Sequence, residues 1–241
     1  AAHRSGGPMK PYYQDEYVTL YHGDCREVLF MLYRHDVPFL CDVLISDPPY
    51  AEETHNGART GDGSVPLMDF PPIAASDIRL VLERAKVRRW AVATMDWRHI
   101  AEIERQPPAG FRFVRFGVWV KPNGAPQFTG DRPATGWEGV AILHRENGEA
   151  MKWNGGGSHA VWRFNKVNGE HPTTKPQPLM QRIVSLFSDP GETILDPFMG
   201  SGSTQVAAKS LGRKSIGIEI EERYCEIAAR RLSQGVLDLG A

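Results

Sequence analysis

Residues 191–224 read GETILDPFMGSGSTQVAAKSLGRKSIGIEIEERY. A short apolar run ends on Asp196, a glycine-rich loop follows, and the chain then continues with helical spacing into a second apolar run that ends on Glu219. A strand, a helix and a second strand in this order form a parallel βαβ unit, which binds ligands at the carboxyl ends of its strands. The expected elements are a strand over 193–195, a loop over 198–202, a helix to 209, a strand over 215–219 and a helix over 221–233.

The same alternation extends outward to the rest of the chain. We expect strands over 17–21, 41–46, 90–94, 111–121 and 137–144, a hairpin within 152–166 whose second strand is 161–164, and helices over 26–34, 73–89, 97–105 and 178–187. The pattern predicts an α/β fold with a doubly wound, mostly parallel sheet. We interpret 15–241 as one domain and 1–14 as a flexible N-terminus, of which 1–8 resemble a remnant of an expression tag.

Composition excludes several classes of protein. The 241 residues carry 28 Lys and Arg against 29 Asp and Glu, a net charge of −1, and 41% are hydrophobic. A polybasic tail or a histone-like binder is therefore excluded. Cys25, Cys41 and Cys225 are too far apart for a zinc site, and no apolar run reaches the length of a membrane span. We expect free thiols, no metal site, no membrane contact and a cytoplasmic location.

The glycine loop at 196–204, DPFMGSGST, offers a ligand the bare backbone N–H groups of a helix N-terminus. It lacks the Lys of a phosphate-binding loop, and Gln205 stands where a dinucleotide-binding loop has its third glycine. An NAD-dependent enzyme is therefore disfavoured. Glu219 follows Gly202 at a distance that suits an acceptor for two ribose hydroxyls. Together the loop and Glu219 predict a ligand that contains a nucleoside.

A second motif, Asp47-Pro48-Pro49-Tyr50, ends the apolar run at 41–46. The two prolines remove two N–H donors and stiffen the backbone, which leaves the Asp47 carboxylate and the neighbouring carbonyl groups as rigid acceptors. Acceptors fixed at the end of a strand suit an exocyclic amino group. Tyr50 offers a flat face to the ring that carries such a group.

The tetrapeptide DPPY followed by DPFMGSGST resembles the amino-group DNA methyltransferases that use S-adenosylmethionine, in the permuted arrangement called the β class. The likeness extends to HPTTKP at 171–176 and to GIEIEERY at 217–224, and it covers nearly the whole chain from Val18 to Leu232. It implies a Rossmann-like fold of the class I methyltransferase type with a small loop and hairpin insertion for target recognition. That insertion is expected in 51–72, 122–135 and 150–168.

The resemblance implies a role for each matched residue. Asp47 and the Pro48 carbonyl would accept the two amino hydrogens of a base flipped out of duplex DNA, Pro49 would stiffen the motif, and Tyr50 would stack on the base. Glu219 would hold the ribose, Asp24 the adenine amino group, and Lys175 the methionine carboxylate of the cofactor. The remaining residues implied for the cofactor are Cys25, Asp196, Phe198, Gly200, Ser201, Gly202, Ser203 and Thr204.

Asp at position 47 favours adenine N6 as the methyl acceptor and weighs against the relatives that modify protein amides, whose tetrapeptide begins with Asn. Cytosine N4, an adenine of RNA, and a silent subunit that only binds DNA or cofactor remain as alternatives. Double-stranded DNA is the expected partner. A homodimer and a cognate restriction endonuclease are left open as further partners.

Charge is distributed unevenly along the chain. Residues 79–182 carry 17 basic and 9 acidic side chains, whereas both ends of the chain are acidic. We therefore expect a local basic surface that contacts phosphates, with salt-dependent binding. The candidate DNA contacts are Arg59, Lys121, Arg132, Lys152, Arg163 and Lys166.

Overall fold

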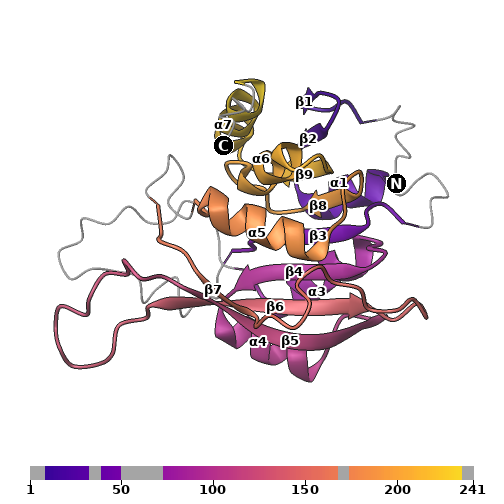
Figure 1. Ribbon diagram of the computed structural model, residues 1–241. Coiled ribbons are helices and arrows are strands. Elements are labelled where there is room, and N and C mark those ends of the chain that lie inside the picture. The colour runs from indigo at the N-terminus through magenta and orange to yellow at the C-terminus, as the bar shows by residue number, and fades with distance from the viewer. Residues whose placement is uncertain (1–8, 33–38, 50–72, 168–173, 235–241) are drawn as a thin grey trace.

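The computed structural model describes residues 9–32, 39–49, 73–167 and 174–234 (Figure 1). Nine strands form one sheet in the order β1-β2-β9-β8-β3-β4-β6-β5-β7. The strands are β1 (Tyr13–Gln14), β2 (Val18–His22), β3 (Val43–Ser46), β4 (Trp90–Met95), β5 (Phe111–Val120), β6 (Trp137–Arg145), β7 (Val161–Arg163), β8 (Thr193–Asp196) and β9 (Lys214–Glu219). The helices are α1 (Cys25–Leu32), α3 (Ala75–Arg84), α4 (Trp97–Arg105), α5 (Gln177–Phe187), α6 (Ser203–Ser210) and α7 (Glu222–Ser233).

The sheet is mostly parallel, as the sequence predicts. β2, β9, β8, β3 and β4 pair in parallel, β6 runs antiparallel between β4 and β5, and β7 is parallel to β5. The inner strands β3 and β4 are buried along their whole length, because helices cover both faces of a parallel sheet. Their continuous apolar sequences reflect this double burial.

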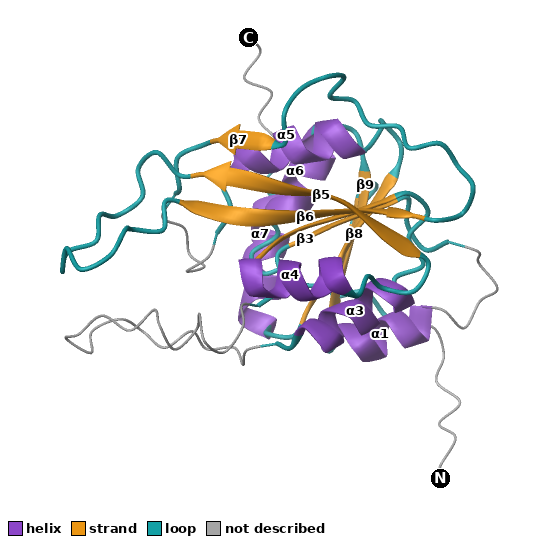
Figure 2. Cartoon of the chain, turned by 90° about the horizontal axis from the view of Figure 1, so that it is seen from below, coloured by secondary structure: helices purple, strands orange, loops and turns teal. Residues whose placement is uncertain are grey.

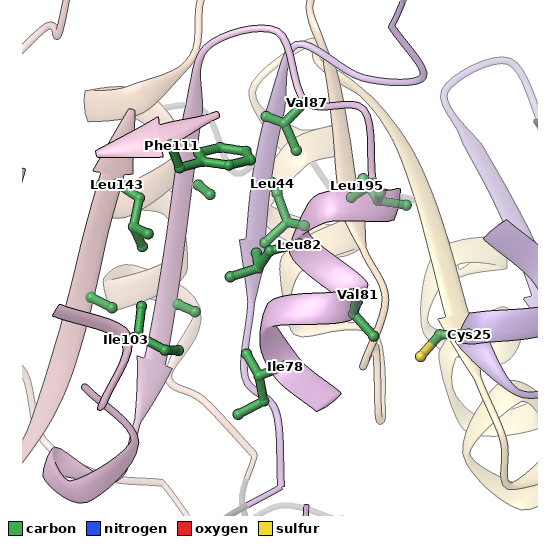
Figure 3. Packing of buried hydrophobic residues seen from close by; sticks show 14 of the residues in the cluster. Cys25, Leu44, Ile78, Val81, Leu82, Val87, Ile103, Phe111, Leu143 and Leu195 are labelled. Carbon is green, nitrogen blue, oxygen red and sulfur yellow. The ribbon is translucent and has the colours of Figure 1, made fainter. Parts of the chain in front are cut away.

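Helices form a layer on each side of the sheet (Figure 2). α1, α3 and α4 pack on one face, where Cys25, Ile78 and Ile103 belong to a single buried cluster with Leu44 of β3 (Figure 3). On the other face, α5 and α6 bury Leu179, Ile183 and Ala207 against β3 and β8. α7 packs on β2 through a third cluster.

The predicted hairpin within 152–166 is wrong. Val161–Arg163 forms β7, but β7 pairs in parallel with Val118–Val120 of β5, and no strand precedes it within 151–160. The Trp162 side chain is buried in the same cluster as Trp119, which explains why so short a strand pairs with β5. The segment therefore adds an edge strand to the sheet.

The expected flexible N-terminus is also partly wrong. Tyr13 and Gln14 form β1, which pairs with β2, and the backbone N–H of Tyr12 donates to the Leu20 carbonyl at 2.8 Å. The Asp15 carboxylate accepts from the N–H groups of Tyr17 and Val18, both at 2.8 Å, and so fixes the turn. Residues 12–14 thus belong to the sheet edge, and 1–8 lie outside the described residues.

The order of the strands reverses between β3 and β8. From β3 the chain proceeds outward through β4 to the far edge, and it then returns to the other side of β3 as β8 and β9. Such a reversal leaves a crevice at the carboxyl ends of the two central strands, where ligands of open α/β sheets bind. Asp47 follows β3 and Asp196 ends β8, so both motifs meet at this crevice.

The close packing between the loop that precedes α6 and helix α7 can be tested by substitution of Gly202. Its φ is +78°, and a Cβ atom there would lie 2.9 Å from the Ala228 Cβ of α7. Gly212 has a similar φ of +71° with open space around it. We expect Gly212→Ala to lower the unfolding free energy by about 1 kcal/mol through backbone strain. We expect Gly202→Ala to lower it by a further ~1–3 kcal/mol through overpacking. Urea denaturation measures both variants, and equal decreases in their unfolding free energies would contradict the close packing at Gly202.

Candidate active site

A cavity of about 350 Å³ opens at the carboxyl ends of β2, β3, β8 and β9. This volume is in the range of small-molecule sites. Eleven residues predicted from the two motifs and their surroundings line it: Asp24, Cys25, Asp47, Pro48, Pro49, Lys175, Phe198, Gly200, Ser201, Ser203 and Glu219. The structure therefore brings together the DPPY motif and the glycine loop, although about 150 residues separate them in the chain.

Glu219 is fixed at the end of β9 by backbone donors. The N–H of Gly200 donates to its Oε2 at 2.8 Å, and the N–H of Glu221 donates to its Oε1 at 2.9 Å. Burial raises the pKa of the Glu219 carboxyl, and these backbone hydrogen bonds oppose the rise. Gly200 reaches this position with a φ of +52°, which glycine adopts readily. A carboxylate has about four lone-pair sites, more than the backbone N–H groups of Gly200, Ile220 and Glu221 use, so acceptor capacity remains for a ligand in the cavity.

Asp24 immediately precedes α1 and lines the same cavity. Its Oδ1 accepts from the backbone N–H of Arg26 at 2.8 Å, and its Oδ2 pairs with the Arg26 guanidinium at 2.5 Å. The Arg26 hydrogen bond lowers the pKa of the Asp24 carboxyl. Asp24 therefore acts as a helix cap and an ion-pair partner, and its predicted contact with an adenine amino group stays a prediction.

Asp47 follows β3 and holds two donors. Its Oδ1 accepts from the Thr94 hydroxyl at 2.6 Å, and its Oδ2 accepts from the Lys175 ammonium at 2.5 Å. Burial raises the pKa of the Asp47 carboxyl, whereas the Lys175 charge opposes that rise. About a fifth of the side chain stays exposed, on the cavity side. The carboxylate is thus held in place and still accessible.

The surroundings of Lys175 differ from the sequence-based expectation. Only 5% of its side chain is exposed, and its ammonium lies between Asp47 and Glu138, with the Glu138 Oε2 at 3.3 Å. Lys175 lines the cavity, but its charge is directed at these two carboxylates. Its predicted contact with the methionine carboxylate of a cofactor stays a prediction.

Three residues predicted to bind cofactor are absent from the cavity lining: Asp196, Gly202 and Thr204. The Asp196 carboxylate is buried below the cavity, where its Oδ1 accepts from the Ser46 hydroxyl at 2.5 Å and from the Phe198 N–H at 3.2 Å. Thr204 also hydrogen bonds to Asp196, and burial raises the pKa of the Asp196 carboxyl to about 6. These residues shape the loop, because their polar atoms are used to hold its backbone.

The predicted DNA contacts fall into two groups. Lys121, Arg163 and Lys166 lie at the carboxyl ends of β5 and β7, on the same edge of the sheet as Asp47. Lys166 is held there by two backbone hydrogen bonds with the Asn123 side chain. Lys121 is paired with Glu138 at 2.5 Å, so its charge is partly used within the protein.

Arg132 lies in the segment between β5 and β6, which extends beyond the sheet in Figure 1, and it pairs with Asp131 at 2.7 Å. Lys152 lies away from this edge, and its predicted contact with DNA stays a prediction. Its carbonyl accepts from the indole of Trp90, the first residue of β4, so Lys152 lies at the amino end of that strand. Tyr50, Arg59, His171 and the loop 51–72 lie outside the described residues.

Sequence reasoning missed several residues of the site. Glu138 is the second residue of β6, and Thr94 is the second-last residue of the otherwise apolar strand β4, so neither stands out from its neighbours. Phe128, between β5 and β6, is 88% exposed. An aromatic residue in this turn-rich loop is a sequence signal that could have marked it as a candidate contact. Further lining residues that were missed are Arg26, Ile73, Asp77, Val81, Thr174, Pro197, Met199, Ile218, Ile220, Glu221 and Tyr224.

Comparison with known proteins identifies the family. The model of the N6/N4 DNA methylase family matches residues 41–230. The chain belongs to this family. It is 30% identical to the type II methyltransferase M2.LlaDCHI of Lactococcus lactis subsp. cremoris over 97% of this chain and 96% of that protein. It is 31% identical to the type II methyltransferase M2.DpnII of Streptococcus pneumoniae over 95% of this chain and 96% of that protein.

A solved structure confirms the fold of this DNA methylase. The M1.HpyAVI–SAM complex superimposes with a TM-score of 0.69 at 26% identity, and the match covers 89% of this chain and 99% of that chain. The class I methyltransferase fold and the use of S-adenosylmethionine, predicted from the motifs, are confirmed. Among the helices of the described residues, none is long and apolar enough to cross a membrane.

The cavity suits S-adenosylmethionine in its chemistry. That molecule contains a ribose with two hydroxyls, an adenine and a charged methionine end. The fixed Glu219 carboxylate supplies acceptors for the hydroxyls, while Phe198, Val81 and Ile218 supply apolar walls. In the part of the chain that the structure describes, no group of three or more His, Cys, Asp or Glu side chains is arranged to hold a metal ion.

The buried Asp196 carboxyl predicts a pH dependence of stability. Its pKa is about 6 in the folded chain against an ordinary value of 3.8. Between these values the folded state holds a proton that the unfolded state has released, so the unfolding free energy falls as pH rises. We expect Asp196→Asn to remove this slope. The unfolding free energy of the variant minus that of wild type should therefore be ~2–3 kcal/mol higher at pH 7 than at about pH 4.

Urea denaturation of both proteins at the two pH values measures this difference. Ser210→Ala, which removes a half-buried hydroxyl at the end of α6, serves as a control without a titratable group. A difference between Asp196→Asn and wild type that stays constant with pH would contradict a raised pKa at this position.

Proposed function

We propose that this chain transfers a methyl group from S-adenosylmethionine to the exocyclic N6 of an adenine in double-stranded DNA. The observation that carries the proposal is the position of the Asp47 carboxylate. It lies in the same cavity as the Glu219 carboxylate and is fixed by Thr94 and Lys175. An acceptor for amino hydrogens thus lies beside an acceptor for ribose hydroxyls.

On this proposal, residues at the carboxyl ends of β8, β9 and β2 would hold the cofactor. Glu219 holds the ribose through the lone pairs that its backbone donors leave available. Gly200, Ser201 and Ser203 line the cavity beside the start of α6, and Asp24 and Cys25 line it at the start of α1. When bound, S-adenosylmethionine supplies an electrophilic methyl group on a sulfonium sulfur.

The DPPY motif positions the methyl acceptor. Asp47 and the Pro48 carbonyl accept the two amino hydrogens, which draws the nitrogen lone pair out of conjugation with the ring and aims it into the cavity. The surplus proton on the nitrogen can leave through the Asp47 carboxylate. Tyr50, implied by the family motif, stacks on the flipped base. Catalysis here is mainly positioning and electrostatics, because a sulfonium is a good leaving group.

Adenine N6 is favoured over cytosine N4 by the Asp at position 47, as the family resemblance indicates. A cytosine amino group presents the same two hydrogens to the same acceptors, so cytosine N4 is the alternative that the site itself allows. The family is one of DNA methylases, which favours DNA over RNA as the acceptor. Membership of this family also weighs against the alternative that the chain is a silent subunit that only binds DNA or cofactor.

Duplex DNA would approach the edge that carries Asp47. Arg163 and Lys166 are exposed at this edge, and Arg132 and the 88% exposed Phe128 extend from the loop between β5 and β6. This surface offers cations for phosphates and an aromatic ring for bases. Recognition through the loops 51–72 and 122–135 and the segment 150–168 is part of the proposal, apart from Lys152 at the opposite edge.

The relatives named above are type II methyltransferases. We therefore propose a role in a restriction-modification system, with a cognate endonuclease that acts on the same sequence. A cytoplasmic location in a bacterial, archaeal or phage-infected cell and a homodimer belong to the same proposal.

Asp47→Ala tests the proposed role of the carboxylate. We expect it to abolish transfer of labelled methyl groups to DNA and to leave cofactor binding, measured by calorimetry, within a few-fold of wild type, because Glu219 and the glycine loop stay intact. Wild-type protein should label duplex DNA in preference to RNA or protein. Retained transfer by the variant would overturn the role of Asp47, and label confined to RNA would overturn the proposed substrate.

Arg163→Gln combined with Lys166→Gln tests the DNA edge. Loss of two phosphate contacts should weaken binding of duplex DNA uniformly across sequences and lower the slope of log K against log salt by about 1 per residue. Lys152→Gln removes one charge at the opposite edge and should leave binding unchanged. The reverse outcome, in which only Lys152→Gln reduces the slope, would place the duplex on the other edge.

A further inference from the structure

A row of alternating charges crosses the sheet edge behind Asp47. The Thr94 hydroxyl and the Lys175 ammonium contact Asp47 at 2.6 and 2.5 Å. The same ammonium lies 3.3 Å from the Glu138 Oε2, and the Lys121 ammonium contacts the Glu138 Oε1 at 2.5 Å. The row therefore connects the end of β3 with β4, β5, β6 and the segment that precedes α5.

The ammonium of Lys175 is shared between two carboxylates. Its side chain is 5% exposed, and those of Asp47 and Glu138 are 21% and 15% exposed. The ring of Trp119 lies beneath both cations, with its centroid 5.9 Å from the Lys175 Nζ and 4.9 Å from the Lys121 Nζ. Trp119 is itself fixed, because its indole donates to the Phe164 carbonyl at 2.8 Å.

Stability alone does not account for this arrangement. Taking charges out of water is so unfavourable that a buried ion pair is often no better than apolar residues of the same volume. The row is charge-balanced, with two carboxylates and two ammoniums, and its inner end is the carboxylate that faces the cavity. The geometry of this row is suited to setting the charge of the Asp47 carboxylate and the direction in which that carboxylate points.

We propose that Glu138 is a positioning residue of the methyl transfer, which acts on Asp47 through Lys175. With Glu138 present, the Lys175 ammonium is shared between a hydrogen bond to Asp47 and an ion pair with Glu138, so Asp47 keeps acceptor capacity for an amino group. Without Glu138, Lys175 pairs with Asp47 alone and weakens it as an acceptor. Lys121 balances the charge of Glu138 on the solvent side. The inference rests on the proposed function, because it assigns Asp47 to the amino group.

The charged groups around Asp47 determine in which direction a substitution shifts the titration of its carboxyl group. Lys175 favours the ionised form of Asp47, whereas Glu138 disfavours it. Asp196, buried behind Ser46, also interacts electrostatically with Asp47. Among the described residues these are the charged groups that face Asp47 from the neighbouring elements, together with Lys121 at the outer end of the row. Protonated Asp47 is a weaker acceptor of an amino hydrogen than the carboxylate and cannot take up the proton that the nitrogen loses, so its titration sets the acidic limb of the rate profile.

The test is the single-turnover rate of methyl transfer to saturating duplex DNA as a function of pH. Glu138→Gln should move the acidic limb to lower pH and reduce the plateau rate several-fold. Lys175→Met should move the limb to higher pH by about one unit, since it removes a cation beside Asp47. Glu104→Gln, which makes the same charge change on an exposed position of α4, should match wild type in both respects.

Lys121→Gln keeps the inference testable if Glu138→Gln does not fold. It removes the cation that balances Glu138, so the limb should move to higher pH by less than in Lys175→Met. A profile of Glu138→Gln that superimposes on wild type, or limbs that move in the same direction in Glu138→Gln and Lys175→Met, would overturn the inference. So would an unmoved limb in Lys121→Gln. Absence of transfer by the wild-type chain would instead overturn the proposed function.

Discussion

The site depends on the pairing of β3 with β8. This pairing places Asp47 and Asp196 at one edge of the sheet, and the Ser46 hydroxyl joins the two strand ends by donating to Asp196 at 2.5 Å. Without it, the DPPY motif and the glycine loop would be two unrelated turns. The reversal of strand order at this point opens the cavity in which both motifs meet.

Three carboxylates gather around this junction, and each is stabilised differently. Backbone N–H groups hold Glu219, hydroxyl and backbone donors hold Asp196, and an ammonium with a hydroxyl holds Asp47. Burial alone would favour the protonated form of all three. The donors therefore determine which carboxylate keeps its charge, and only Asp47 has a full countercharge within hydrogen-bond distance. That difference matches the role proposed for Asp47 at the reacting nitrogen.

Much of the fold follows from local sequence. The apolar runs of β3 and β4 and the glycine loop before α6 are evident because buried parallel strands and helix N-termini have distinctive residue patterns. Val161–Arg163 was assigned to a hairpin because three residues carry no information about their partner, and the burial of Trp162 beside Trp119 decides it. The position of Lys152 at the amino end of β4 is likewise not evident from the sequence, since it depends on a contact with the distant Trp90.

The motif residues of the site were also evident from sequence, but their partners were not. Lys175 contacts Asp47 across 128 residues of chain, and Glu138 belongs to a strand that pairs between β4 and β5. Ion pairs of this kind follow from the order of strands in the sheet, which periodicity does not determine. Asp24 illustrates the converse, because its local role as a helix cap is visible from the sequence while its ligand is not.

The central claim is that Asp47, fixed at the β3–β8 junction, presents an amino nitrogen to the cofactor cavity. The most direct measurement is the nucleoside composition, by mass spectrometry, of duplex DNA treated with this chain and S-adenosylmethionine. The account predicts N6-methyladenine as the methylated nucleoside. A methyl group on a ring carbon, which no amino-hydrogen acceptor would explain, would contradict it.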